Sequence, residues 1–341
     1  MSQLVEQIAE LTAFRDRDAL DFSLAMALKD LLRPESVAVH RVVGEPGRQH
    51  WLLRARVGGV EGAPVADSLW TELESLPALA ALPHHAQCLQ GNRTVLVDGT
   101  PAAMLFPIAN EREAVGVLEV RTEQALAADA QHLVCSILRI YRNFQGLLEY
   151  SERDTLTGLL NRKTFDECFM RAAARARAGD VVVPDAQRAT KDCGAWLGVV
   201  DIDHFKRVND SFGHLIGDEV LLLLSRLMRG TFRHHDLLFR FGGEEFVVLM
   251  RCACAADARA ALERLRIAVE RHVFARVGHI SISIGVAEVR ADDAPTACFE
   301  RADKAVYFAK QNGRNRLCDY DELIARGLLA DESRSGDVEL F

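Results

Sequence analysis

The chain has 341 residues, of which 49% are hydrophobic and 26% charged, and its formal net charge is −8. This length exceeds the usual size of one domain and predicts two, each with its own core. A negative chain is a poor partner for nucleic acid and for anionic membrane surfaces, because both attract basic proteins. The start of the chain lacks a basic segment followed by an apolar one, and no run of eighteen apolar residues follows. We therefore expect a cytoplasmic protein with no nucleic-acid or membrane partner.

The first third of the chain predicts an α+β domain over residues 1–125. Residues 19–33 carry apolar side chains at helical spacing, and Pro34 ends the pattern. The β-rich runs 36–43 and 51–57 are separated by a turn that contains Gly and Pro, which predicts a hairpin. Residues 104–108 and 114–120 predict two more strands around a polar turn.

The next segment, residues 126–153, predicts a helical coiled-coil linker. Its apolar residues alternate spacings of four and three: Leu126, Ala130, Leu133, Ile137, Ile140, Phe144 and Leu147. A heptad seam of this kind pairs two helices, so it predicts a homodimer. The alternative is that the same stripe packs on the helix's own domain.

Residues 154–322 predict a second domain in which strands and helices interleave, followed by a C-terminal tail at 323–341. Four strands are expected, at 196–201, 237–241, 245–250 and 279–289. Four helices are expected, at 162–177, 216–229, 256–274 and 296–311. The order βαββαβ, with two strands joined by a tight Gly-Gly turn, favours a ferredoxin-like or polymerase-palm fold over a parallel Rossmann sheet. Residues 178–194 are expected to form an insertion before the first strand.

Several carboxylates are expected at one edge of this sheet. The apolar strand 196–200 ends at Asp201, and the Gly-Gly turn is followed by Glu244 and Glu245. Neighbouring carboxylates repel one another, and a divalent cation with its preference for oxygen ligands relieves this repulsion. Basic side chains suited to phosphate follow in the sequence: Lys206, Lys310 and Arg314. Each feature alone is common among proteins.

In combination, these features resemble the GGDEF family of diguanylate cyclases over residues 151–320. Five ordered stretches carry the resemblance: DTLTGLLNR from Asp154, DIDHFKRVNDSFGHLIGDEVL from Asp201, RFGGEEFVVLM from Arg240, ISISIGVAEV from Ile280 and RADKAVYFAKQNGRNR from Arg301. In the signature turn, Glu244 replaces Asp and keeps the carboxylate. The resemblance implies an enzyme that condenses two GTP into cyclic di-GMP with release of two pyrophosphates.

The resemblance also implies the roles of individual residues. Asp201, the backbone carbonyl of Ile202 and Glu244 would hold two Mg²⁺ per active site, with Mn²⁺ as a substitute. Glu245 would help to deprotonate the 3′-hydroxyl. The substrate-binding residues divide into guanine readers, Asn209 and Asp218, and a phosphate group made of Lys206, Lys310, Arg314 and backbone N–H groups around Phe205.

Regulation is implied at three levels. Each domain resembles a half-site for one GTP, so the reaction would require a homodimer formed through the N-terminal domain and the linker helix. Arg233, Asp236 and Arg264 match an inhibitory site for the product cyclic di-GMP. Residues 1–125 resemble a GAF sensor domain in architecture alone, with a PAS-like fold as the alternative and the sensor ligand unknown. A metal site at the adjacent histidines 84 and 85, or at 234 and 235, is disfavoured because neighbours on a strand point to opposite faces. Cys88 beside His84 and His85 is the exception considered as a ligand residue of the sensor domain.

Three other functions compete with the cyclase. A catalytically silent GGDEF domain would act as a receptor for GTP or cyclic di-GMP. A cyclase with mixed GMP–AMP products is disfavoured by the presence of Asp218. An interaction protein built around the predicted stalk would bind no nucleotide.

Overall fold

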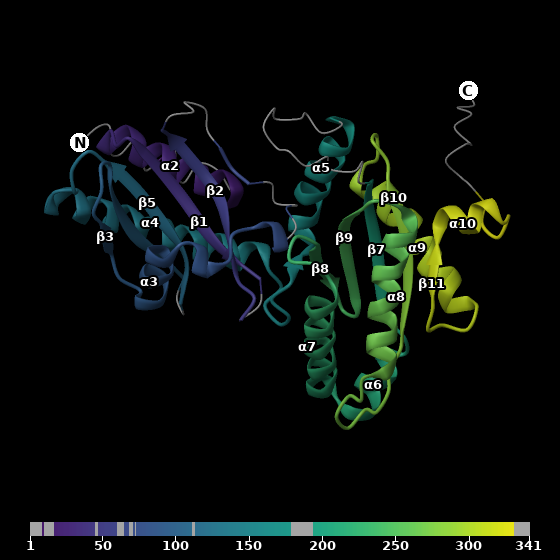
Figure 1. Ribbon diagram of the computed structural model, residues 1–341. Coiled ribbons are helices and arrows are strands. Elements are labelled where there is room, and N and C mark those ends of the chain that lie inside the picture. The colour runs from purple at the N-terminus through teal and green to yellow at the C-terminus, as the bar shows by residue number, and fades with distance from the viewer. Residues whose placement is uncertain are drawn as a thin grey trace. The chain divides into compact units, whose positions relative to one another are not determined.

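The computed structural model describes residues 9, 17–44, 47–59, 65–67, 71, 73–110, 113–178 and 194–330. The chain divides into two compact units, Met1–Ser151 and Glu152–Phe341 (Figure 1). The predicted insertion, apart from its two end residues, and the tail from residue 331 lie outside the described residues. Within the described part of the chain, no helix combines the length and the apolar character needed to cross a membrane.

The first unit is built on a five-stranded antiparallel sheet in the order β2-β1-β5-β4-β3. Its strands are β1 (Ser36–Val43), β2 (His50–Gly58), β3 (Val95–Val97), β4 (Ala102–Ala109) and β5 (Ala114–Thr122). The helical segments are α2 (Arg17–Leu32), η1 (Leu73–Ser75), η2 (Leu79–Ala81), α3 (Pro83–Gly91) and α4 (Ala128–Glu152). The four predicted strands and the first helix are confirmed, whereas β3 and α3 were not predicted.

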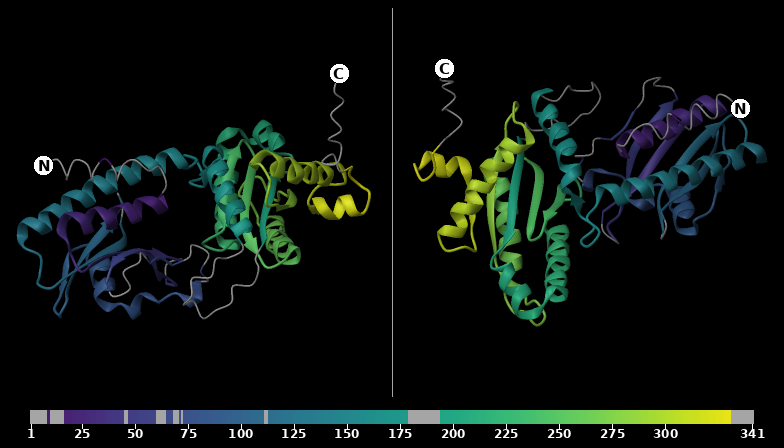
Figure 2. Two further views of the ribbon diagram at one scale, coloured as in Figure 1. Left: turned by 90° about the horizontal axis from the view of Figure 1, so that it is seen from above. Right: turned by 180° about the vertical axis from the view of Figure 1, so that it is seen from behind.

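Side-chain alternation along the strands separates two layers in this unit. Val37 and Val39 of β1 face a core that they share with α2 and α4. On the other face of the sheet, side chains such as Val117 of β5 pack in a smaller cluster with Trp51 and with Cys88 of α3. Helices therefore cover both faces of the sheet (Figure 2).

Helix α4 packs much of the predicted seam on the core of its own unit. Its buried residues are Val134, Ile137, Tyr141 and Leu148, and they pack on the core of the first unit. Of the predicted seam residues, Ile137 is buried, whereas Leu147 is 68% exposed. The physical reason is a polar anchor, since the Tyr141 hydroxyl donates to Asp21 of α2 and turns this face toward the sheet. The helix thus follows the alternative in which its stripe packs on its own domain, and the paired stalk stays a prediction.

The second unit contains a six-stranded sheet in the order β11-β10-β7-β9-β8-β6. Its strands are β6 (Leu160–Asn161), β7 (Gly194–Ile202), β8 (Leu237–Gly242), β9 (Glu245–Cys252), β10 (Ile282–Val289) and β11 (Leu317–Asp319). The four central strands pair antiparallel, and short parallel strands extend both edges. Taken in chain order, the central strands are arranged fourth, first, third, second, as a βαββαβ chain requires, so the expected mixed α+β palm-type fold is confirmed.

Helices cover both faces of this sheet. They are α5 (Arg162–Ala178), α6 (Phe205–Phe212), α7 (His214–Thr231), α8 (Ala255–Arg271), α9 (Pro295–Gln311) and α10 (Tyr320–Ala325). One core joins the sheet to α6, α7 and α8, and the other joins it to α5, α9 and α10 (Figure 1). The predicted tail begins too early, because Leu323 of α10 is buried in the second core, where it adds apolar area to the fold.

Candidate active site

Strand β7 delivers a carboxylate to the end of the sheet. The strand is buried along nearly its whole length, and Asp201 near its end is only 6% exposed. Asp201 lies directly opposite Glu245 across the β7–β9 pair. Because side chains of directly opposed residues share a face, these two predicted catalytic carboxylates lie together.

The turn between β8 and β9 is braced from behind. Gly242 has φ 144° and Gly243 has φ 50°, a backbone conformation that glycine adopts at no steric cost. The guanidinium of Arg240 donates to the carbonyl oxygen of Gly243 at 2.9 and 3.2 Å and also pairs with Asp154 at 3.0 Å. Asp154 in turn accepts from the hydroxyl and the backbone N–H of Thr157. Arg240 and Asp154 therefore fix the position of Glu244 and Glu245. Both residues belong to the sequence motifs, but the sequence did not predict this role for them.

The electrostatics of Asp201 are those of a crowded carboxylate. Burial raises the pKa of Asp201 to about 6; the hydrogen bond and charge of Lys310 oppose this shift, and the charges of Glu244 and Glu245 add to it. Lys310 Nζ lies 2.8 Å from Asp201 Oδ2. One ammonium group thus pairs with a carboxylate that two further carboxylates crowd, an arrangement that a divalent cation relieves.

The predicted phosphate-binding residues occupy three different elements. Lys206 is exposed on α6, and Lys310 lies in the last turn of α9, where it pairs with Asp201. Arg314 follows in the loop after α9 with φ 60°, and its backbone N–H donates to the carbonyl of Ala309. Lys310 was expected to bind phosphate, and the structure adds a role as the counter-ion of Asp201.

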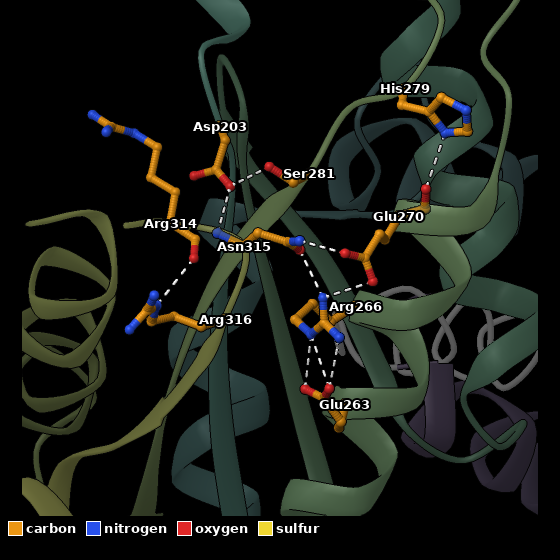
Figure 3. Close-up of polar contacts among 9 residues, drawn as sticks. All are labelled: Asp203, Glu263, Arg266, Glu270, His279, Ser281, Arg314, Asn315 and Arg316. Atoms are coloured by element: carbon orange, nitrogen blue, oxygen red, sulfur yellow. Dashed lines mark hydrogen bonds and ion pairs between the residues drawn. The ribbon is translucent and has the colours of Figure 1, made fainter. Parts of the chain in front are cut away.

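Asp203 forms a second, saturated carboxylate site two residues beyond Asp201. Its carboxylate accepts from the hydroxyl of Ser281 at 2.7 Å and from the backbone N–H of Asn315 at 3.0 Å (Figure 3). It also accepts from the hydroxyl of Ser283 at 2.7 Å. Its own N–H donates to the carbonyl of Ser281. This cluster was not predicted from the sequence. The spacing of Ser281 and Ser283, which places both hydroxyls on one face of the strand segment beside β7, is the signal that could have indicated it. Asp203 ties the end of β7 to the loop that carries Arg314.

A second layer of polar contacts holds that loop to α8. The side-chain amide of Asn315 donates to Glu270 at 2.6 Å and its oxygen accepts from Arg266 at 2.7 Å. Arg266 also pairs with Glu263 and Glu270. The side chain of Arg314 extends away from this network (Figure 3). The network thus fixes the backbone of the loop and leaves the guanidinium of Arg314 outside it.

The predicted guanine readers lie at the corner between α6 and α7. His204, with φ 59°, precedes α6 in a left-handed conformation that turns the chain out of β7. Asn209 of α6 packs against Gly217 of α7 so closely that a Cβ at position 217 would lie 2.0 Å from Asn209 Oδ1. Asp218 follows Gly217 and is half-buried.

Two other predicted site residues have buried side chains. Ile202 is 1% exposed and Phe205 is 5% exposed, and both side chains belong to the hydrophobic core. Only their backbone groups are therefore available to a ligand, as expected for the carbonyl of Ile202 and for the N–H groups around Phe205.

The predicted inhibitory residues lie on neighbouring elements. Asp236 accepts from the backbone N–H of Arg233 at 2.9 Å, and its own N–H donates to the carbonyl of Arg233. This turn follows α7, and Arg264 is exposed on α8, which packs against α7. The side chain of Arg233 is also exposed.

Comparison with known proteins identifies the second unit. The family described as "Diguanylate cyclase, GGDEF domain" matches residues 151–316. Diguanylate cyclase DgcP of Pseudomonas aeruginosa is 42% identical over 169 residues, which are 48% of this chain and 23% of that protein. Diguanylate cyclase DgcZ of Escherichia coli is 36% identical over 176 residues, which are 50% of this chain and 54% of that protein. The chain thus spans about half or less of the length of these curated relatives.

A solved structure covers the same region. The crystal structure of the GGDEF domain of DgcB from Caulobacter crescentus in complex with c-di-GMP is 33% identical, with a TM-score of 0.45. The match covers 50% of this chain and 96% of that domain. The family match, the signature turn and the carboxylate at the end of β7 agree, and residues 151–316 form a GGDEF domain of the diguanylate cyclase family.

Proposed function

We propose that this protein is a diguanylate cyclase that condenses two GTP into cyclic di-GMP and releases two pyrophosphates. The observation that carries the proposal is the placement of Asp201 opposite Glu245, with Glu244 in the braced turn beside them. The names of the curated relatives, DgcP and DgcZ, support the same activity.

The donor set of this site fits Mg²⁺. Asp201, the carbonyl of Ile202 and Glu244 would hold two ions, and Mn²⁺ is chemically able to replace them. The raised pKa of Asp201, about 6, fits this assignment, because a carboxylate crowded by others gains most from a cation. When bound, Mg²⁺ neutralises the negative charge of the triphosphate at the α-phosphate.

The remaining residues bind and orient GTP. Asn209 and Asp218 read guanine at the α6–α7 corner, where a carboxylate accepts from two N–H groups that adenine does not present together. The β- and γ-phosphates are bound by Lys206, Lys310 and Arg314. When GTP is bound, the ammonium group of Lys310 contacts phosphate in addition to Asp201, so its ion pair with Asp201 becomes weaker. Glu245 accepts the proton of the attacking 3′-hydroxyl.

The active unit is a homodimer in this proposal. One domain binds one GTP, so each 3′-oxygen must reach the α-phosphate of the nucleotide on the partner, and the distance between the two half-sites controls the rate. The first unit, with helices on both faces of its sheet, acts as a GAF-like or PAS-like sensor that sets this distance through α4.

The test is turnover of GTP by the full chain with Mg²⁺, followed through cyclic di-GMP and pyrophosphate. Glu244→Ala should lower kcat by at least about 100-fold because it removes a metal ligand. The matched control is Glu300→Ala, which removes an exposed carboxylate on α9 and should leave kcat unchanged. Full activity of Glu244→Ala would overturn the metal assignment, and GTP binding without product would favour the receptor function.

Product inhibition gives a second test. Arg233 has an exposed side chain beside a turn closed by Asp236, which suits it to bind a guanine or phosphate of cyclic di-GMP. Arg233→Ala should raise the inhibition constant for cyclic di-GMP by about 10-fold or more and leave the initial rate unchanged. The check is a series of initial rates with added product, in which an inhibition curve identical to that of the wild type would refute the assignment.

A further inference from the structure

The first unit brings together three side chains that the sequence separates widely. His40 of β1, His85 of α3 and Glu119 of β5 are each less than 9% exposed. Their ligand atoms all lie within 4.8 Å of one another. Neither the family match nor the proposed catalysis involves these residues, because both belong to the second unit.

The fold itself accounts for this cluster. In the antiparallel β1–β5 pair, Glu119 lies opposite Ala38, so Glu119 and His40 share a face as diagonal neighbours. Helix α3 packs on the same face, against β4 and β5, and brings His85 to them. The ring centroids of His40 and His85 are 4.8 Å apart, and Trp51 makes edge contacts with both rings. The cluster is therefore enclosed by apolar surroundings on the sheet.

The cluster holds buried imidazole nitrogens that form no hydrogen bond with the described residues. Nε2 of His40 is one of them, and Nε2 of His85, which lies in contact with Glu119 without hydrogen-bond geometry, is another. A buried polar atom in this state destabilises the fold and calls for a reason. Burial, reinforced by His85, lowers the pKa of His40 to about 4, so the ring is neutral and keeps a lone pair. Arg56 and Arg121 act on His40 in the same direction, and Glu119 acts against them.

The other two side chains are also suited to ligation. Nε2 of His85 lies 2.9 Å from Oε2 of Glu119, and the second oxygen of Glu119 accepts from Nε of Arg121 at 2.5 Å. Arg121 thus holds the carboxylate in place, as outer groups commonly do for metal ligands. Cys88 lies three residues after His85 on α3, but burial raises the pKa of its thiol to about 12. We assign Cys88 to the hydrophobic cluster rather than to the ligand set.

We propose that the first unit binds one divalent transition-metal ion through the imidazoles of His40 and His85 and the carboxylate of Glu119. Two imidazoles and one carboxylate form a ligand set used by Zn²⁺ and Fe²⁺, and they do not suit Mg²⁺, which prefers oxygen ligands. In a tetrahedral zinc site the ligand atoms lie about 3.4 Å apart, given Zn–N distances of about 2.1 Å. The ligand atoms lie within 4.8 Å of one another and reach this spacing through small side-chain shifts, and the fourth position is left for water or a small ligand.

The competing explanation is an ion pair without metal. In that case His85 pairs with Glu119, and His40 is a core residue that packs on Trp51. The two explanations differ in what they require of His40, because the ion pair does not need its Nε2 atom. Metal binding that depends on His40 as well as on His85 therefore separates them.

The experiment is zinc titration of the full chain after dialysis against a chelator, with excess Mg²⁺ present to occupy the oxygen-rich catalytic site. Isothermal calorimetry should give one high-affinity Zn²⁺ site, and Co²⁺ should give visible ligand-field bands. His40→Gln and His85→Gln should each weaken binding by about 100-fold or more, because each removes a direct ligand. The matched control is His84→Gln, because His84 is the exposed neighbour of His85 and should leave binding unchanged.

Two further measurements keep the test decisive. Circular dichroism and thermal melting in chelator establish that each variant is folded. Zn²⁺ should raise the Tm of the wild type and of His84→Gln, but not that of His40→Gln or His85→Gln. If His85→Gln unfolds, Glu119→Gln takes its place. Absence of a high-affinity Zn²⁺ site, or binding that survives loss of His40 or His85, would overturn the proposal. Neither result bears on cyclic di-GMP synthesis, which the Glu244→Ala experiment tests separately.

Discussion

Asp201 and Asp203 are two residues apart on the same strand end, and their surroundings assign them different tasks. Asp203 accepts three hydrogen bonds from protein donors, and it holds the loop after α9 in place. Asp201 has Lys310 as its ionic partner within the described residues and faces two further carboxylates. Asp203 therefore stabilises the fold, whereas Asp201 remains available to a ligand.

This contrast predicts opposite effects of Asp→Asn changes on stability. The pKa of Asp201 is about 6 in the folded state and about 3.9 when unfolded, so stability falls as pH rises between these values. Asp201→Asn should abolish turnover and stabilise the protein by roughly 1 to 2 kcal/mol at about pH 7.5, a gain that shrinks below about pH 5. Urea unfolding at both pH values, without added metal, measures the effect.

The control for this prediction is the neighbouring aspartate. Asp203→Asn weakens hydrogen bonds from Ser281, Ser283 and Asn315 and should destabilise the protein by roughly 1 to 3 kcal/mol. A destabilised Asp201→Asn at neutral pH would show that the pair with Lys310 outweighs the crowding of the carboxylates.

At the scale of elements, the α6–α7 corner combines a close helix contact with a binding site. Gly217 permits α7 to approach Asn209, because a Cβ at this position would collide with the Asn209 side chain. Gly230 near the end of the same helix has no neighbour within 4 Å of an added Cβ. The two glycines therefore have different reasons to be present.

Alanine substitution should separate these two roles. Gly217→Ala displaces the Asn209 side chain and should raise KM for GTP by about 10-fold, with a smaller effect on kcat. Gly230→Ala should leave KM unchanged and stabilise the protein by about 0.5 to 1 kcal/mol, as expected for replacing Gly in a helix. Steady-state kinetics and thermal melting of both variants provide the measurement. Equal KM values for Gly217→Ala and the wild type would contradict the role of Asn209 in reading guanine.

At the scale of the whole molecule, α4 joins two units that have separate cores. Its buried face belongs to the first unit, and two large side chains near its end are exposed, Leu147 at 68% and Tyr150 at 78%. Exposed apolar residues on one helix favour association with a second copy. We propose that they form part of the surface of the homodimer; Leu147 belongs to the heptad seam expected from the sequence, whereas Tyr150 does not.

Leu147→Glu tests this surface. The charge should weaken dimerisation by about 10-fold or more, because it places an ion in an apolar interface. Cyclic di-GMP production should then rise more steeply than linearly with protein concentration over a range where the wild type is already linear. The matched control is Arg142→Glu, which alters an exposed residue on another face of α4 and should leave the dimer intact. Sedimentation velocity would refute the proposal if Leu147→Glu were as dimeric as the wild type.

Local patterns in the sequence were sufficient for the second unit. Apolar runs and the Gly-Gly turn predicted strands β7 to β10, and short motifs located Asp201, Glu244 and Glu245 at the strand ends. These features succeed because strand-forming composition and turn chemistry act over a few residues. Helices α6 and α3 were not predicted, because they are short and their stability depends on packing rather than on a long amphipathic pattern.

Contacts between distant segments were decided by the tertiary structure alone. The hydrogen bonds of Asp203 with Ser281 and Asn315 and the cluster of His40, His85 and Glu119 join residues that are separated by tens of residues or more. The buried face of α4 also followed from such a contact, the hydrogen bond between Tyr141 and Asp21. Strand pairing and helix packing set these neighbours, and short sequence patterns do not specify which distant residues meet. The sequence therefore determined the elements and the family of this protein, whereas its tertiary structure decided which polar groups meet inside it.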